Sequence, residues 1–302
     1  MSAQGLDETA RARLLLVALA FAWGLNWPAI KIGLEEFSPW TYRLGGFTIS
    51  ALTLMALVKL QGKSFAVPRG RIWLHIVVSS LLNIVVFGLF STFAQLTAST
   101  SRVAVVTYSF PVWASLLGWL VLGESLNRYA IAGLTLCITG LAILIYPVLG
   151  SEALIGLSLS LACAVTWAFA TIYIKLSRLP SDLAITTWQV IFAAFVMAIL
   201  VPIFHGPLTF GPISTRSALA VLFSGIVGTG LAYVMWFKVA SHLSAATASI
   251  GTLAVPVIGV VSSALILGER PSVADWIGFA LIFAAAASVI FAPREQAPSA
   301  AP

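Results

Sequence analysis

Long apolar runs separated by short polar connections dominate this sequence and restrict what it can fold into. Of its 302 residues, 60% are hydrophobic and only 9% are charged, a balance that excludes a soluble globular enzyme. Because a membrane-spanning helix uses about 20 apolar residues, ten spans take roughly 200 residues and leave no room for a folded domain outside the membrane. We therefore predict an all-α integral membrane protein with ten transmembrane helices, at residues 14–34, 38–58, 72–94, 103–122, 129–147, 154–174, 183–203, 217–237, 245–267 and 274–292.

The positive charges indicate orientation rather than a nucleic-acid partner. The formal net charge is +6, but the lysines and arginines are scattered between the apolar runs and form no patch. Cytoplasmic loops of membrane proteins carry an excess of Lys and Arg. With the N-terminus in the cytoplasm, eleven of the sixteen basic residues fall on the cytoplasmic side, four on the other, and Arg43 inside the second span. Both termini are therefore predicted to be cytoplasmic, and no nucleic acid is expected to bind.

The two halves of the sequence match each other at offsets of 144 and 145 residues. The matching positions are Trp23 with Trp167, Lys31 with Lys175, Pro111 with Pro256, and Leu-Gly-Glu at 122–124 with Leu-Gly-Glu at 267–269. Since five spans are an odd number, the chain enters the second repeat from the other side of the membrane, and the repeats are inverted. The predicted organisation is a cytoplasmic tail (1–13), a first five-helix repeat (14–147), a second one (148–292) and a cytoplasmic tail (293–302). Inverted repeats are a recurrent architecture of secondary transporters, with the substrate site near the midplane.

These repeated motifs, in this order and spacing, resemble the EamA-type ten-helix members of the drug/metabolite transporter superfamily, over residues 12–292. The resemblance implies export of amino acids or other small metabolites across a bacterial inner membrane, with no cofactor. Within the family, the tryptophan-rich chain is most similar to the bacterial aromatic amino-acid exporters. The expected partners are a small-molecule substrate and the lipid bilayer, and the protein is expected to be a monomer.

Polar and aromatic side chains within the spans are the candidate substrate-binding residues, because such groups turn away from lipid. Prolines in the fourth and ninth spans free a carbonyl one turn earlier, at Thr107 and Thr252. Aromatic rings suit an aromatic side chain or an ammonium group on a substrate. Close helix packing and interfacial anchoring are the alternative roles for these residues. The candidates are Trp23, Asn26, Asn83, Phe87, Phe90, Thr107, Tyr108, Pro111, Trp167, Thr171, Thr229, Tyr233, Thr252 and Pro256.

Charged residues are nearly absent from the spans. Arg43 could extend to the interface or attract a substrate carboxylate, and we expect the first. No acidic residue falls in the middle of a span, which disfavours coupling to protons through a buried carboxylate and favours facilitated export. Glu124 and Glu269, at the ends of the fourth and ninth spans, are expected to hydrogen-bond loops in a structural role.

Three other functions fit the sequence less well. An intramembrane enzyme needs a catalytic or metal set at membrane depth, but there is no H-E-x-x-H motif or intramembrane aspartate pair, and the three histidines lie near span ends. No metal site is therefore expected. A channel needs a filter or charged ring rather than inverted repeats. A sugar-phosphate or nucleotide-sugar carrier calls for Lys or Arg at depth, where this chain offers only Arg43. A proton-coupled drug or metabolite exporter stays open as an alternative.

Overall fold

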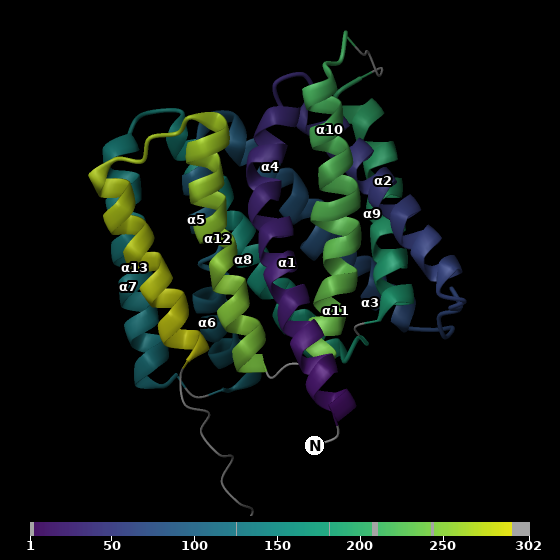
Figure 1. Cartoon of the computed structure of the whole chain (residues 1–302). Helices are drawn as coiled ribbons and strands as arrows, with labels where there is room; N and C mark the ends of the chain where they lie inside the picture. The colour runs from purple at the N-terminus through teal and green to yellow at the C-terminus, as the bar shows by residue number, and fades with distance from the viewer. Residues whose placement is uncertain (1–2, 125, 181, 207–210, 243–244, 292–302) are drawn as a thin grey trace, which may run out of the picture.

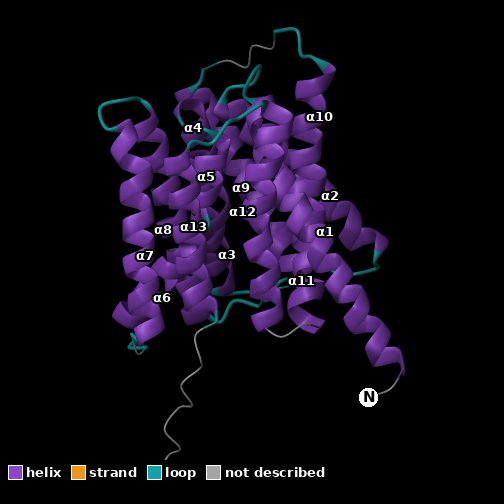
Figure 2. Ribbon diagram, turned by 60° about the vertical axis from the view of Figure 1, so that its left-hand side comes forward, coloured by secondary structure: helices purple, strands orange, loops and turns teal. Residues whose placement is uncertain are grey.

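The computed structural model describes residues 3–124, 126–180, 182–206, 211–242 and 245–291. Within these ranges every regular element is helical and no strand occurs. The helices stand side by side in one bundle, with the connections gathered at its two ends (Figures 1 and 2). We call these the lower end, where α1 begins, and the upper end, as drawn in Figure 1.

In chain order the elements are α1 (Ala3–Gly33), α2 (Pro39–Leu60), α3 (Ile72–Ser80), η1 (Leu81–Val86), α4 (Phe87–Thr97), α5 (Thr100–Thr107), α6 (Phe110–Leu122), α7 (Arg128–Ile145), η2 (Tyr146–Val148), α8 (Ala153–Ser177), α9 (Leu183–Phe204), α10 (Thr215–Phe223), η3 (Ser224–Leu231), α11 (Ala232–His242), α12 (Ala245–Leu267) and α13 (Val273–Ile290).

Among the described residues, nine helical segments are long and apolar enough to cross a membrane. They are Ala10–Gly33, Pro39–Leu60, Ile72–Thr97, Thr100–Leu122, Arg128–Val148, Ala153–Ser177, Leu183–Phe204, Thr215–Trp236 and Val273–Ile290. A further apolar helical stretch, Thr252–Leu267, is shorter and forms most of α12. The chain is therefore a multi-pass membrane protein, and its spans coincide with the predicted ones to within a few residues at most of their ends.

Local side chains cap several helix ends by hydrogen-bonding backbone groups that have no partner within the helix. A bilayer requires such capping because its interior contains no water to bind those groups. Ser38 accepts a hydrogen bond from the backbone N–H of Thr41 at the start of α2, and Pro39 follows at the first helical position. At the start of α13, Ser272 and Asp275 form a capping box. At its C-terminal end, α6 stops at Gly123, whose φ of +67° lies in the left-handed region that favours glycine.

Helix packing follows a pattern that recurs between the two halves. α1 packs against α12, and α8, which matches α1 at the 144-residue offset, packs against α5 and α6. α1 also packs on α10, η3 and α11, just as α8 packs on α3, η1 and α4. Two pairs, α2 with α9 and α7 with α13, join the halves directly, the second pair at one edge of the bundle (Figure 1). The main contacts of α1 thus have counterparts in those of α8.

Two π-helical turns interrupt corresponding spans. η1 begins at Leu81 in one span, and η3 begins at Ser224 in the other, 143 residues later. Such turns are rare and often mark functional segments. Close packing accompanies the second turn, because a Cβ atom at Gly228 would lie 2.5 Å from the side-chain oxygen of Asn26. The turn thus brings the η3 backbone directly against α1.

The fourth span differs from the sequence prediction of a single helix. α5 ends at Thr107, α6 begins at Phe110, and Pro111 lies in the first turn of α6. The N–H groups of Tyr108 and Ser109 still donate, to the carbonyls of Ala104 and Val106, at 3.1 Å each. In contrast, α12 runs without a break through Pro256. The two matching prolines therefore occupy different local structures.

Candidate functional site

Five aromatic rings from four spans meet inside the bundle. The Phe110 and Trp167 rings are stacked, with centroids 4.0 Å apart and planes 19° apart. Trp167 also meets Phe87 at 5.3 Å and Tyr108 at 5.7 Å, both edge to face. Tyr108 in turn meets the Trp27 ring at 6.4 Å. We call Trp27, Phe87, Tyr108, Phe110 and Trp167 the aromatic cluster.

The aromatic cluster lies near the middle of the spans. Trp167 is the fifteenth residue of the 25-residue α8, so it lies about 21 Å from the start of a helix about 37 Å long. Phe87 begins α4 directly after the π-turn η1, and Tyr108 occupies the break between α5 and α6. Irregular backbone at both places turns these rings toward α8.

Sequence reasoning identified three members of this cluster, Phe87, Tyr108 and Trp167, and missed two. Trp27 lies one helical turn after the chosen Trp23, and Phe110 lies directly before the chosen Pro111. Helical spacing from Trp23 could have indicated Trp27. The inward direction of Phe110 depends on the helix break, and Pro111 is the only signal of that break in the sequence.

A second group of predicted residues lies beside the other π-turn. The Ser224 hydroxyl donates to the Asn26 side-chain oxygen at 2.6 Å and also hydrogen-bonds the Tyr42 hydroxyl. The Trp23 ring meets the Trp236 ring at 6.0 Å. These contacts join α1, α2 and η3 and occupy the Asn26 side chain in a structural hydrogen bond.

The other predicted residues lie outside the aromatic cluster. Thr107 is fully buried and its hydroxyl has no hydrogen-bond partner in the described part of the chain. Thr171 is exposed and donates to the Trp167 carbonyl at 2.9 Å, within its own helix. Pro256 is buried, Tyr233 packs against the α2–α9 contact, and the half-buried remainder comprises Asn83, Phe90, Pro111, Thr229 and Thr252.

The expectation that Arg43 extends to the interface is wrong. Its side chain is only 7% exposed. The Nε group donates to the Gly88 carbonyl at 2.8 Å, and Nη2 donates to the Ser91 hydroxyl at 2.8 Å. Acceptors on the neighbouring α4 hold the guanidinium inside the bundle, so it does not need the interface.

Polar contacts close the upper end of the bundle across the two halves. The Glu269 carboxylate accepts from the backbone N–H of Thr100 at 2.6 Å and of Ser101 at 3.0 Å, at the start of α5, where the first N–H groups have no acceptor within the helix. Beside it, Arg102 pairs with Asp275 at 2.5 Å. At the lower end, the matching Glu124 instead pairs with Lys175. Glu269 therefore has a structural role, as expected, but its partner is another helix rather than a loop.

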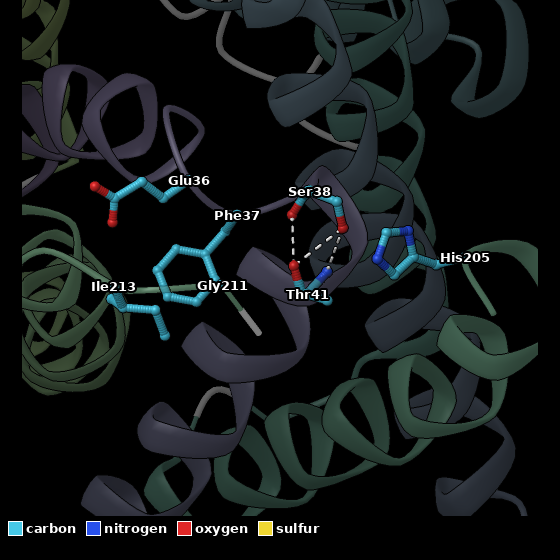
Figure 3. A pocket seen from close by; sticks show the side chains of 7 residues that line it. All are labelled: Glu36, Phe37, Ser38, Thr41, His205, Gly211 and Ile213. Carbon is cyan, nitrogen blue, oxygen red and sulfur yellow. Dashed lines mark hydrogen bonds between the residues drawn. The ribbon is translucent and has the colours of Figure 1, made fainter. Parts of the chain in front are cut away.

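A small polar pocket lies at the upper end, away from the aromatic cluster. Figure 3 shows Ser38 and Thr41 hydrogen-bonded at its centre, with His205 to one side. Its other lining residues are Glu36, Phe37, Gly211 and Ile213. The Ser214 backbone N–H donates to the Glu36 carboxylate at 2.8 Å and holds the pKa of that group below its usual value. With a volume of about 170 Å³, this pocket is smaller than the roughly 300–1,000 Å³ typical of ligand sites.

A larger groove of about 500 Å³ runs along α1 and η3, and its lining is entirely apolar, including Phe21, Leu25, Phe223 and Met235. It offers no polar group to orient a substrate. Among the described residues, no group of three or more His, Cys, Asp or Glu side chains could hold a metal ion. The aromatic cluster is therefore the strongest candidate site.

Apolar spans packed into one bundle define a multi-pass membrane protein. More particularly, the chain belongs to the EamA-like transporter family, whose profile matches residues 10–146 and again residues 154–291. The family lies in the drug/metabolite transporter superfamily, as the sequence motifs predicted.

Individual relatives match over most of their length. "Uncharacterized transporter YoaV" of Bacillus subtilis (strain 168) is 23% identical over 276 residues, which span 90% of this chain and 94% of the relative. "Probable amino-acid metabolite efflux pump" of Escherichia coli (strain K12) is 25% identical over 288 residues, 89% of this chain and 91% of the relative. A solved crystal structure at 22% identity superposes with a TM-score of 0.64 and covers 92% of this chain and 96% of the solved one. That likeness concerns the fold.

Proposed function

We propose that this protein exports amino acids, both aromatic and other neutral ones, or related small metabolites across a bacterial inner membrane. The observation that carries the proposal is the aromatic cluster at mid-depth, which offers ring faces and edges to an aromatic side chain and a ring face to an ammonium group. A relative named as a probable amino-acid metabolite efflux pump supports the same substrate class. The bacterial origin of the relatives supports the location.

Alternating access between two inverted repeats is the proposed mechanism. Ten spans, with α12 as the ninth, would place both termini in the cytoplasm and the upper end of the bundle outside. Three observations support the repeats: the family profile matches twice, the packing contacts recur between the halves, and the π-turns η1 and η3 correspond. The conformation described here has its upper end tied by Glu269 and by the Arg102–Asp275 pair. Release to the outside requires those ties to separate.

We propose that the substrate moves down its own concentration gradient, by facilitated transport. In the nine described spans, the only acidic residue is Asp275, and it lies at the third position of α13. A carboxylate at depth is the usual means of linking proton binding to an occluded site. The transporter is proposed to act as a monomer, which light scattering of the purified protein in detergent would check.

The test is uptake and release of radiolabelled amino acids by proteoliposomes, with and without an imposed pH gradient, against protein-free liposomes. We expect phenylalanine, tyrosine and tryptophan to move without the gradient, together with other neutral amino acids. Movement only with the gradient would replace facilitated export by proton coupling. No movement of any amino acid would refute the substrate class and favour drugs or phosphorylated metabolites.

A further inference from the structure

Arg43 is a buried cation with no part in the proposed transport cycle. Its side chain is 7% exposed, and its guanidinium carbon lies 5.7 Å from the ring centroids of both Tyr42 and Phe47. Its hydrogen-bond acceptors in the described part of the chain, the Gly88 carbonyl and the Ser91 hydroxyl, are both uncharged. Arginine stays protonated in proteins. The bundle therefore holds a full positive charge with only neutral partners.

The side chain reaches toward the middle of the membrane rather than toward the nearer helix end. Arg43 lies four residues after the start of α2 at Pro39, or about 6 Å. Its partner Gly88 lies nine residues before the end of α4 at Thr97, or about 13 Å. Both helix ends lie on the upper side because α2 and α4 belong to consecutive antiparallel spans. The guanidinium is thus deeper than its own backbone.

Glycine at position 88 makes this approach possible. A Cβ atom there would lie 2.7 Å from the Phe47 ring and 3.4 Å from the Arg43 side chain. Without one, the guanidinium can lie against the α4 backbone and reach the carbonyl oxygen. The contact is therefore built into the packing of α2 on α4.

The charge borders the aromatic cluster. Gly88 directly follows Phe87, whose ring meets Trp167. The Phe87 carbonyl accepts a hydrogen bond from the Cys163 thiol of α8 at 3.3 Å, which holds α4 and α8 together at this depth. Directly before Phe87, the π-turn η1 gives the backbone a segment that can change its hydrogen-bonding register. A cation and a set of ring faces are thus side by side.

An unpaired buried guanidinium is costly, and an anion that supplies its missing N–H acceptors relieves that cost. Guanidinium geometry suits a carboxylate, which it binds through two parallel hydrogen bonds. None of the described spans carries an acidic residue that reaches this site, since Asp275, the single one, pairs with Arg102. The missing anion must then come from outside the protein.

We infer that Arg43 binds the carboxylate of the transported amino acid while the aromatic cluster receives its side chain. The inference rests on the proposed function and deepens it, because it makes a free carboxylate a requirement for recognition. The stacked Phe110 and Trp167 rings separate to admit the substrate, and Ser91 keeps the guanidinium in position. Substrates without a carboxylate bind weakly.

The experiment compares phenylalanine with phenylalaninamide, which differ only at the carboxylate. Binding is measured by calorimetry on purified protein in detergent, and transport by uptake into proteoliposomes. We expect the wild-type protein to bind phenylalanine at least tenfold more tightly than the amide. In Arg43→Gln, the affinity for phenylalanine should fall at least tenfold and the affinity for the amide should change little. Arg43→Lys keeps the positive charge but not the paired N–H donors of the guanidinium, so its affinity for phenylalanine should be intermediate. Lys59→Gln removes the same charge from an exposed position of the same helix and behaves as wild type.

Several outcomes decide the inference. If Arg43→Gln binds phenylalanine as tightly as the wild-type protein does, the carboxylate site is overturned, even where amino-acid transport is observed. Binding that depends on Arg43 without any transport supports the carboxylate site and refutes the exporter. If Arg43→Gln does not fold, Ser91→Ala carries the test: a several-fold loss of preference for phenylalanine over the amide supports the site, and an unchanged preference overturns it. If the wild-type protein binds neither compound, both proposals fail.

Discussion

The fourth span of each half matches the other in sequence without a gap, but the two spans differ in backbone shape and in side-chain chemistry. Tyr108, Phe110 and Trp113 of the first half match Leu253, Val255 and Ile258 of the second at the 145-residue offset. In the first half the span breaks into α5 and α6, whereas α12 is continuous. Aliphatic side chains fit a regular helix packed against α1, while the break turns rings toward α8. The two spans therefore share a sequence match, while the aromatic rings of the proposed site lie in one half only.

Charge shows the same imbalance. At the 144-residue offset Arg43 matches Thr187, which donates to the Leu183 carbonyl within its own helix. In the third and eighth spans, Gly88-Leu89 matches Gly230-Leu231 at an offset of 142, so that Phe87 matches Thr229. The proposed site is thus displaced from the boundary between the repeats into the first half and α8. In the proposed mechanism, the packing shared by the halves would allow the movement, and the side chains that differ between them would give the specificity.

The largest effect should come from the two matching tryptophans. Trp167→Leu should lower the initial transport rate at least tenfold, because it removes three ring contacts, each worth about 0.5–1.5 kcal/mol. Trp23→Leu, which loses the contact with Trp236, should lower it less than threefold. Rates are measured in proteoliposomes and normalised to folded protein.

The control for this comparison is Phe169→Leu, an exposed position of the same helix, which should transport as wild type. Equal losses for the two tryptophan variants would contradict a one-sided site. They would place recognition on both repeats.

An intermediate effect should separate the two matching glutamates. Glu269→Gln should lower the stability of the folded protein by about 1–3 kcal/mol, because one side-chain oxygen that accepts from the start of α5 becomes an amide donor. Glu124→Gln should cost less than about 1 kcal/mol, since its partner Lys175 is exposed. Thermal unfolding in detergent measures both, and a larger loss for Glu124→Gln would reverse the assignment of the closed end.

The smallest effect should come from the matching prolines. Pro111 lies in the first turn of α6, where a missing N–H costs little, so Pro111→Ala should leave stability nearly unchanged. Pro256 lies inside α12, so Pro256→Ala supplies a missing helix donor and should raise the thermal midpoint. Hydrogen exchange should then show slower exchange around residue 256. Identical behaviour of the two variants would mean that the helix break is not a stable difference between the halves.

Members of the aromatic cluster could be predicted from sequence where side-chain type and depth were sufficient; that they bind substrate stays a prediction. Phe87, Tyr108 and Trp167 were recognised because aromatic residues in the middle of apolar runs are conspicuous. Phe110 was missed because its direction depends on the break before α6, and Arg43 was misjudged because its length allows either direction. The local sequence does not determine the direction in which a side chain points from its helix. Nor does it determine which hydrogen-bond acceptors the neighbouring helix presents.

What the sequence determined by itself was the membrane-spanning class, most span boundaries, the family and the internal match between the halves. Hydropathy sums along the chain, and each span satisfies its own backbone hydrogen bonds, so spans can be read one at a time. The tertiary structure decided which rings meet, that Arg43 turns inward onto Gly88, and that Glu269 closes on the start of α5. Those outcomes depend on contacts between helices far apart in the chain, where packing and neighbouring acceptors select one arrangement among several that hydropathy allows equally.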